Sequence, residues 1–237
     1  VAGDWDGHHI GSPMVISTGV IFEMWYDGRD LTDTQIGRAT SPDEINWTKD
    51  AENPLLGSGT PFAWDYGSVW EPFVLLDGGT YEMWYTADDN AIGYVTSTNG
   101  ITWTRCPDPV LEGGPSGAWD EGGVSDPYVI KASGTYTMWY ESWTDTGRIG
   151  CATSTNGINW TKCAANPVLG PGNPGDWDET AVHDPVVVLH NGIYHMWYRG
   201  TGPDWTWHIG YVTSTNGTTW NRFLTNPVLS GTAGQWD

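Results

Sequence analysis

Cations are scarce in this chain. Only 9 of its 237 residues are lysine or arginine, against 29 aspartates and glutamates, which gives a formal net charge of −20. Nucleic acids and anionic membranes are disfavoured as partners, because both repel an acidic surface. The charge suits a secreted, extracellular protein, which we expect, and equally a protein from a salty habitat.

Long apolar runs are also missing. No segment approaches the roughly eighteen consecutive apolar residues that a membrane-spanning helix needs. We therefore expect a soluble chain without membrane insertion. It begins at Val1 rather than at methionine, which is compatible with the removal of a signal peptide.

Cysteine occurs only three times. Cys106 and Cys163 each follow a tryptophan by three residues, at the same position of an internal repeat, and Cys151 lies across an Asn-Gly turn from Cys163. That arrangement permits a Cys151–Cys163 disulfide. We favour three small buried thiols instead.

The chain is rich in one repeated segment. This segment occurs four times, over residues 10–26, 69–85, 124–140 and 182–198. Each copy contains a residue–proline pair, an apolar run, a glycine-containing break and Met-Trp-Tyr, in this order. Two β-forming runs joined by a tight turn predict an antiparallel hairpin. Each repeat therefore begins with a hairpin whose second strand carries Met-Trp-Tyr.

A second hairpin follows in each repeat. Ile-Gly, a Thr-Ser pair and a turn, which is Asn-Gly in three copies, lead to a tryptophan eleven residues after the isoleucine, and Trp-Asp closes the unit. Four strands that recur every 55–59 residues predict an all-β propeller with four-stranded antiparallel blades. We expect a single β-propeller domain over residues 1–237, with repeats at about 5–63, 64–118, 119–176 and 177–235.

Tryptophan is abundant, and 13 of the 17 copies occupy repeated positions: Trp-Asp, Met-Trp-Tyr and the fourth strand. We expect these to form the core between blades, because tryptophan buries a large area. The other four are free to serve a binding site: Trp70, Trp143, Trp205 and Trp207.

The residue before the first-strand proline varies, as Ser12, Glu71, Asp126 and Asp184. The first strand of a propeller blade lies nearest the central channel, so these four residues should converge at the channel mouth, beside the variable linker that follows Met-Trp-Tyr. Further varied residues near these two positions complete the predicted binding site: His183, Glu141, Arg148, Arg199 and His208.

These residue types point to carbohydrate chemistry. Carboxylates around one pocket can have their pKa values pushed apart, so that one acts as an acid and another as a base. Inverting glycosidases hold such a pair roughly 6.5 to 9.5 Å apart. Aromatic rings can stack on sugars, while Arg and His bind their hydroxyls. The competing interpretation is that Asp-Pro and Glu-Pro only begin strands. Because Ser12 shows that the fold does not require an acid there, we predict catalytic roles for Asp126, Asp184 and Glu71.

The unit can be written as x-Asp-Pro, Gly-x-Tyr-x-Met-Trp-Tyr, Ile-Gly-x-Ala/Val-Thr-Ser-x-Asn-Gly-x-x-Trp, Asn-Pro-Val-Leu and a closing Trp-Asp, and all four repeats follow this order with substitutions at some positions. This unit resembles the repeats of the five-bladed β-propeller glycoside hydrolase superfamily, which includes families 43, 32, 62 and 68 and the mannoside phosphorylases of family 130. The resemblance to the arabinanase-like enzymes implies that Asp126 and Asp184 are a general base and an aspartate that tunes its pKa. Those enzymes carry their acid in a Glu-Gly-Pro setting that this chain lacks, and Glu71 is the acid candidate here.

The resemblance to the mannoside phosphorylases also implies an alternative reaction, phosphorolysis. A phosphorylase-like site needs Arg and His for phosphate, and the chain offers Arg199, Arg148, His183 and His208.

Members of the superfamily have five blades, whereas this chain holds four complete units. We expect the ring to close with four; the alternative is an excerpt of a five-bladed propeller.

We therefore expect a glycoside hydrolase-like propeller, of arabinanase or xylosidase type if it is an enzyme, that binds an oligosaccharide or polysaccharide at the channel mouth. No metal or cofactor is predicted. The alternatives are a non-catalytic, lectin-like propeller and a structural module of a larger surface protein.

Substitutions separate these functions. Glu71→Gln and Asp126→Asn should each lower glycoside hydrolysis by a factor of about 10²–10⁴, the contribution of a general acid or base. Trp143→Ala and Trp205→Ala should weaken binding, because they remove stacking surface and no proton donor. Rates on chromogenic arabinosides, xylosides and mannosides, and affinity for an unreactive oligosaccharide, measure the two effects. Binding without cleavage by the wild type would contradict the enzyme interpretation.

Overall fold

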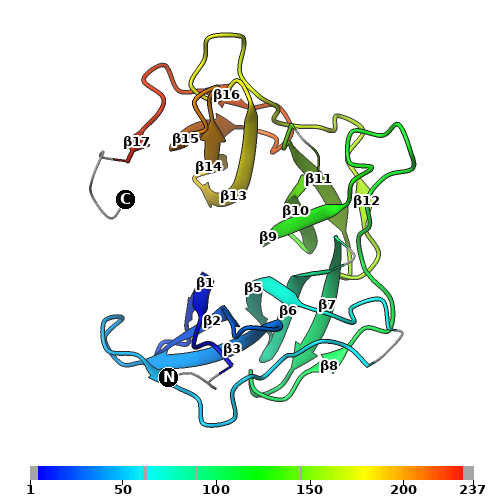
Figure 1. The fold of residues 1–237 in the computed structure, drawn as a ribbon, viewed down its shortest axis with the longest axis vertical. Helices are drawn as coiled ribbons and strands as arrows, with labels where there is room; N and C mark the ends of the chain where they lie inside the picture. The colour runs from blue at the N-terminus through cyan, green and yellow to red at the C-terminus, as the bar shows by residue number, and fades with distance from the viewer. Residues whose placement is uncertain (1–4, 61–62, 89, 143, 145, 232–237) are drawn as a thin grey trace. The chain divides into compact units, whose positions relative to one another are not determined.

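The computed structural model describes residues 5–60, 63–88, 90–142, 144 and 146–231. Within these ranges the regular structure is entirely β-strand, in four antiparallel sheets (Figure 1). No helix of the described part is long and apolar enough to cross a bilayer. The predicted class, a β-propeller of four-stranded blades, is confirmed. The chain divides into two compact units, Val1–Glu112 and Gly113–Asp237, with two blades in each.

The first unit holds blades 1 and 2, each a four-stranded meander with the strands in sequence order. Blade 1 comprises β1 (His9–Ser17), β2 (Phe22–Arg29), β3 (Thr34–Ser41) and β4 (Thr48–Lys49). Blade 2 comprises β5 (Val69–Asp77), β6 (Thr80–Ala87), β7 (Ala91–Ser97) and β8 (Thr104–Arg105).

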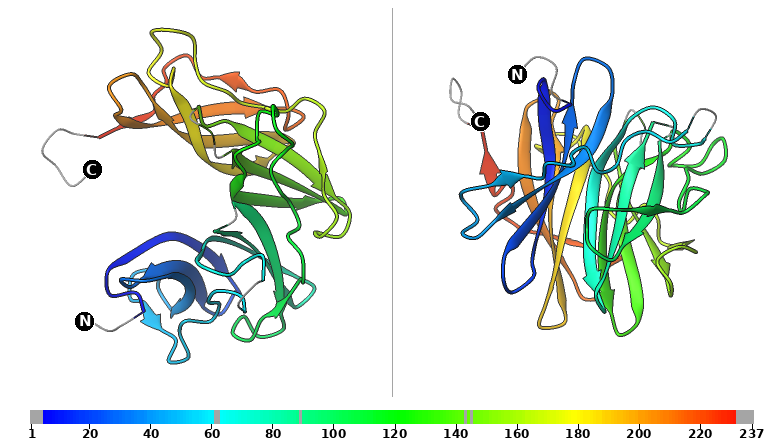
Figure 2. Two further views of the ribbon diagram at one scale, coloured as in Figure 1. Left: turned by 45° about the vertical axis from the view of Figure 1, so that its right-hand side comes forward. Right: turned by 90° about the horizontal axis from the view of Figure 1, so that it is seen from below.

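The second unit holds blades 3 and 4 in the same arrangement, and Figure 2 shows the strands of each blade from two further sides. Blade 3 comprises β9 (Val124–Ala132), β10 (Thr135–Ser142), β11 (Ile149–Ser154) and β12 (Thr161–Lys162). Blade 4 comprises β13 (Ala181–His190), β14 (Ile193–Thr201), β15 (Trp207–Ser214) and β16 (Asn221–Arg222), and the short β17 (Leu229–Ser230) also pairs with β15. Met-Trp-Tyr lies in the second strand of every blade, as predicted. Closure of the four blades into one ring stays a prediction.

The Asn-Gly turns form because their own side chains satisfy the backbone. In blade 3 the Asn156 side-chain oxygen accepts the N–H groups of Ile158 and Asn159 at 3.1 and 2.9 Å, and the Ser154 hydroxyl accepts the N–H of Gly157 at 3.0 Å. Gly157 has φ of 74°, a conformation that glycine adopts without steric cost. The sequence Ser-x-Asn-Gly therefore specifies this turn locally.

The tryptophan of Met-Trp-Tyr joins neighbouring blades within each unit. Trp25 of blade 1 is fully buried and donates its indole N–H to the carbonyl of Gly100 in blade 2 at 3.2 Å. Trp139 of blade 3 does the same to Gly217 of blade 4 at 2.9 Å. A Cβ on Gly217 would lie 2.9 Å from the Trp139 ring, so the turn glycine also makes room for its partner. This part of the predicted inter-blade core is confirmed.

Each Trp-Asp tryptophan that the structure describes packs against the Met-Trp-Tyr tyrosine of its own blade. Trp64 and Trp177 also pack against cores that draw residues from two blades, as predicted. The Trp177 ring lies 5.7 Å from that of Tyr198, and Cβ atoms on Gly200 and Gly210 would clash with it at 2.3 and 2.7 Å. The adjacent Asp178 is 1% exposed and accepts hydrogen bonds from Tyr198 Oη at 2.8 Å and from Arg222 of β16. The motif thus ties the segment that enters a blade to its outermost strand.

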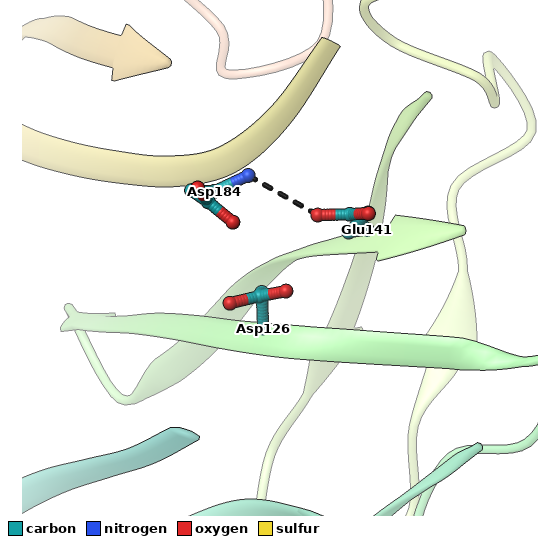
Figure 3. A group of neighbouring side chains, drawn as sticks. All are labelled: Asp126, Glu141 and Asp184. Atoms are coloured by element: carbon teal, nitrogen blue, oxygen red, sulfur yellow. Dashed lines mark hydrogen bonds between the residues drawn. The ribbon is translucent and has the colours of Figure 1, made fainter. Parts of the chain in front are cut away.

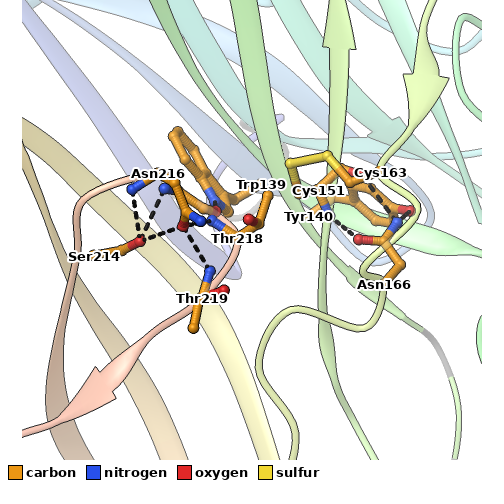
Figure 4. The surroundings of a disulfide bond; sticks show 10 residues. Trp139, Tyr140, Cys151, Cys163, Asn166, Ser214, Asn216, Thr218 and Thr219 are labelled. Atoms are coloured by element: carbon orange, nitrogen blue, oxygen red, sulfur yellow. Dashed lines mark hydrogen bonds between the residues drawn. A yellow bond between two sulfur atoms is a disulfide. The ribbon is translucent and has the colours of Figure 1, made fainter.

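Cys151 and Cys163 form a disulfide, so the favoured interpretation of three free thiols was wrong (Figure 4). The two residues face each other on β11 and the segment after β12, where the Cys163 N–H donates to the Cys151 carbonyl and the Cα atoms are 5.4 Å apart. That separation lies within the range of natural disulfides. Cys106 remains a free thiol, since Tyr94 occupies the position opposite it.

The Asp178 contact generates a stability prediction. Arg222→Met should lower the free energy of unfolding by about 2–3 kcal/mol, less than for a fully buried pair because the Arg222 side chain is 33% exposed. Arg222→Lys should recover most of the loss, since Lys49 and Lys162 pair with the equivalent aspartates of blades 1 and 3. Urea unfolding of the two variants measures the difference, and equal losses would show that charge at this position is irrelevant.

Candidate active site

The residue before the first-strand proline has the same unusual backbone in every blade. Its φ is positive, at 46° for Ser12, 54° for Glu71 and 50° for both Asp126 and Asp184. Positive φ is uncommon for residues other than glycine and is best tolerated by Asp and Asn. The pairing of the first two strands shifts register at each of these residue–proline pairs, which identifies a β-bulge.

Proline accounts for the bulge. It has no N–H to donate to the strand ladder, and it keeps the preceding residue out of the right-handed helical region. β9 already begins at Val124 and β13 at Ala181, so Asp126 and Asp184 lie inside their strands. The interpretation of Asp-Pro as a simple strand start is therefore wrong. A β-bulge changes the direction in which a side chain points, and these two bulges do so for Asp126 and Asp184.

In blades 2 and 4 a carboxylate of the preceding blade accepts the backbone N–H of the bulged acid. Glu141, at the end of β10, accepts the N–H of Asp184 through Oε2 at 3.3 Å. In the first unit Asp27, at the equivalent position of β2, accepts the N–H of Glu71 at 3.4 Å. Asp27 and Glu141, the residues after Met-Trp-Tyr in blades 1 and 3, therefore support the bulge of the next blade. The variation of this position among the repeats gave no sign of that function.

Three carboxylates meet in the second unit. Asp126, Glu141 and Asp184 each place an oxygen within 4.8 Å of the other two (Figure 3). Glu141 is 8% exposed, and both aspartates are half-buried. Convergence of the two first-strand aspartates was predicted and is found; the membership of Glu141 in the same group was not foreseen, because the sequence suggested it only as a ligand-binding residue.

Two basic side chains border this acidic cluster, which we define as Asp126, Glu141 and Asp184. Arg199 of β14 pairs with Asp184, with Nε 2.7 Å from Oδ2, and its guanidinium lies 4.0 Å from the centre of the Trp207 ring. His183 places Nδ1 2.6 Å from Oε1 of Glu141. Arg199 and His183 therefore contact members of the acidic cluster, and Trp207 packs against both of them.

Burial and mutual repulsion set the protonation of the cluster. The pKa of Asp126 lies well above its usual range because the carboxyl is desolvated and because Glu141 and Asp184 repel its charge. Burial also raises the pKa of Asp184, and Arg199 partly offsets that effect. Burial, followed by the charge of Arg199, lowers the pKa of His183. Both shifts favour the uncharged forms, an un-ionised Asp126 beside a neutral histidine.

A proton fits the acidic cluster better than a metal ion. Carboxylate oxygens suit hard cations, but calcium takes about six to eight oxygen ligands. Among the described residues this group comprises three acids, and the guanidinium of Arg199 already brings positive charge to it. The prediction of no metal and no cofactor stays a prediction.

A cavity adjoins the cluster on the Arg199 side. It has a volume of about 180 Å³ and is lined by Arg199, Trp207, His208, Ile209, Leu229, Ser230 and Gly231. The Nδ1 atom of His208 is buried without a hydrogen-bond partner in the described part of the chain, while Nε2 lies 3.0 Å from the Thr206 hydroxyl. A larger cavity on blade 1, of about 390 Å³, is lined mostly by apolar side chains and by no acid.

The remaining predicted site residues are spread over both units, and one of them falls outside the described residues. Trp205 and Trp207, before and at the start of β15, are 67% and 49% exposed. Arg148 precedes β11 and is half-buried. Trp143 falls outside the described residues. Trp70 and Glu71 belong to the first unit, where the Thr86 hydroxyl donates to Glu71 at 2.8 Å, so the catalytic role of Glu71 stays a prediction.

Gly147 is a site residue that the sequence did not reveal. A Cβ on Gly147 would lie 2.3 Å from Cε1 and 2.7 Å from Nδ1 of His183, so the histidine can occupy its place only against a glycine. The Gly147 carbonyl also accepts the N–H of Val182 at 3.1 Å. A glycine in a linker of variable length gives no signal of such a contact before the fold is known.

No protein-family model matches the chain. Among curated proteins, it is 29% identical over 213 residues to the uncharacterized protein Rv1502 of Mycobacterium tuberculosis strain H37Rv, a match that covers 83% of this chain and 68% of that protein. It is 27% identical over 163 residues to the 1,2-beta-oligomannan phosphorylase of Thermoanaerobacter sp. strain X514, covering 62% of this chain and 54% of that enzyme.

Solved structures share the fold. A thermostable family-43 glycoside hydrolase matches with a TM-score of 0.73 and 20% identity, over 94% of this chain and 74% of that one. A structure from the GH130 family of mannoside phosphorylases, which contains glycoside hydrolases that target β-1,2 mannosidic linkages in Candida mannan, matches with a TM-score of 0.75 and 17% identity, over 96% and 73%. The chain thus has the glycoside hydrolase-like propeller fold that its repeats predict.

Asp126→Asn should stabilise the protein at neutral pH. A folded-state pKa above the unfolded value contributes stability at low pH, and that contribution is lost as the pH rises through the folded-state value. The neutral amide should therefore raise Tm near pH 7 by about 2–4 °C, the shift that 1 kcal/mol gives at this chain length. The gain should vanish near pH 4, where wild-type Asp126 is protonated. Calorimetry at both pH values tests this, with Glu52→Gln, at an exposed acid of the first unit, as a control that should leave Tm unchanged.

Proposed function

We propose that the chain cleaves glycosidic bonds and that Asp126 donates the proton to the leaving oxygen. The observation that carries the proposal is the acidic cluster, in which Asp126 lies within 4.8 Å of the oxygens of Glu141 and Asp184, while Glu141 accepts a hydrogen bond and Asp184 pairs with Arg199. Burial and the two neighbouring carboxylates raise the pKa of Asp126. A general acid works best when its pKa is near the operating pH, and burial beside other carboxylates achieves this. Asp126 is thus better suited as an acid than as the base that the resemblance implies.

A group that can hold a sugar borders the acidic cluster, because Trp207 packs against Arg199, which pairs with Asp184. Trp207 is half-exposed at the start of β15, and Trp205 in the preceding loop is more exposed still. Aromatic faces of this kind provide apolar contact area, and a few polar groups fix the orientation of a ligand. Arg199 contributes such a group between Trp207 and Asp184.

The nucleophile distinguishes two reactions. Inverting hydrolysis needs a water between carboxyl groups roughly 6.5 to 9.5 Å apart. Asp126 and Asp184 approach more closely than that, so they do not supply both ends of such a pair. A phosphate nucleophile would not need a second carboxylate. Arg199 and His208, whose Nδ1 has no hydrogen-bond partner among the described residues, border the same cavity and favour phosphorolysis as the second candidate, and a similar protein is an oligomannan phosphorylase.

Asp126→Asn should lower the turnover of a cleavable glycoside by a factor of about 10²–10⁴, because the amide cannot donate the catalytic proton. The wild type and the variant are assayed on mannosides, arabinosides and xylosides, each with and without inorganic phosphate. Release of a free sugar alone indicates hydrolysis, and phosphate-dependent release of a sugar phosphate indicates phosphorolysis.

Matched controls make the result decisive. Glu52→Gln, at an exposed acid of the first unit, should leave turnover unchanged, and an oligosaccharide should bind the wild type and Asp126→Asn equally well. If the wild type cleaves nothing but binds a glycan, the propeller is lectin-like and the proposal fails. Full activity of Asp126→Asn would remove Asp126 from the mechanism.

A further inference from the structure

Both units contain the same hydrogen bond from the N–H of a bulged acid to a carboxylate, but the residue before the bulged acid differs between them. A carboxylate from the second strand accepts the N–H of the bulged acid in both, Asp27 for Glu71 and Glu141 for Asp184. The residue before the bulged acid is Trp70 in the first unit and His183 in the second. The histidine therefore makes a contact that the shared architecture of the bulge does not require.

His183 is held tightly at Glu141. Its side chain is 16% exposed, its ring centre lies 5.8 Å from that of Trp207, and the backbone of Gly147 lies directly against it. Nδ1 is 2.6 Å from Glu141 Oε1, while the other oxygen of Glu141 accepts the Asp184 N–H. Both oxygens of Glu141 thus face a donor.

The direction of this hydrogen bond follows from the groups involved. An ionised carboxylate can only accept, so the proton of a neutral imidazole must reside on Nδ1. Burial and Arg199 lower the pKa of His183, which keeps the ring neutral. Donors that bond the charged form of a carboxyl stabilise that form. His183 and the Asp184 N–H therefore both favour Glu141 as the anion.

We propose that His183 is a positioning residue that decides which carboxyl of the cluster keeps the shared proton, by holding Glu141 as an ionised acceptor and leaving the proton on Asp126. The charged and titratable groups facing this site come from all four neighbouring strands: Asp126 on β9, Glu141 on β10, His183 and Asp184 on β13, and Arg199 on β14. The inference rests on the proposed function, in which Asp126 is the proton donor.

Three variants of the full chain test the inference. His183→Phe keeps a ring but removes the donor, and His183→Asn keeps a side-chain N–H near the position of Nδ1. Gly147→Ala leaves every titratable group in place but drives the imidazole away, because its Cβ would overlap the ring. Carboxyl ¹³C resonances of Asp and Glu are followed against pH by NMR in the presence of a chelator, with Asp126→Asn and Glu141→Gln to assign them.

The wild type should show Asp126 as the last of the three carboxyls to lose its proton. In His183→Phe and Gly147→Ala the proton should move to Glu141, and the Asp126 titration should fall by about one pH unit; His183→Asn should restore the wild-type order. On a cleavable glycoside, the alkaline limb of the pH–rate profile should move to lower pH by the same amount in the first two variants.

The outcomes separate the two proposals. If Asp126 titrates last in every variant and only Tm changes, His183 is merely structural and the inference is overturned. If His183→Phe does not fold, Gly147→Ala and His183→Asn still decide it. A wild type that cleaves no glycoside would overturn the proposed function, while the NMR titration, which needs no turnover, continues to test the role of His183.

Discussion

The left-handed backbone before each first-strand proline is the constraint on which the site depends. Four residues of different chemistry, including Glu71, adopt a φ near 50° there, so the fold imposes the conformation and the side chain follows. Such a conformation costs on the order of 1–2 kcal/mol for an ordinary L-residue, and the surrounding sheet must make up the difference. The carboxylates of Asp27 and Glu141, which bind the bulged N–H groups, contribute to that support. An acid placed at this point is thereby aimed with little freedom to turn away.

The electrostatics of the second unit work against its stability at neutral pH. Arg199 compensates Asp184, but Asp126 faces two carboxylates in a half-buried position. Three other buried acids, Asp65, Asp120 and Asp178, each pair with a cation from the fourth strand of their blade. In the acidic cluster, by contrast, Asp126 faces two further carboxylates, and such a perturbed group is a candidate for function.

Periodicity made most of the fold predictable. Met-Trp-Tyr, Asn-Gly and residue–proline spacing placed the hairpins, because each motif acts through local backbone chemistry. The same spacing brought Asp126 and Asp184 together correctly. It could not show that Trp177 fills space inside its own blade, that Cys151 and Cys163 are bonded, or that Gly147 makes room for His183. Those facts depend on distances between side chains, and a repeat pattern reports only that positions are equivalent.

The indole-to-carbonyl bond between neighbouring blades has an evolutionary consequence. In the two interfaces described, the donor is Trp25 or Trp139 and the acceptor is the turn glycine one repeat later, Gly100 or Gly217. The sequence of repeats 2, 3 and 4 contains both residue types, the tryptophan of Met-Trp-Tyr and the glycine of Asn-Gly. A duplicated or exchanged segment of DNA that spans a single period would carry both halves of the connection. Blades can in this way be shuffled as units without a new interface having to evolve.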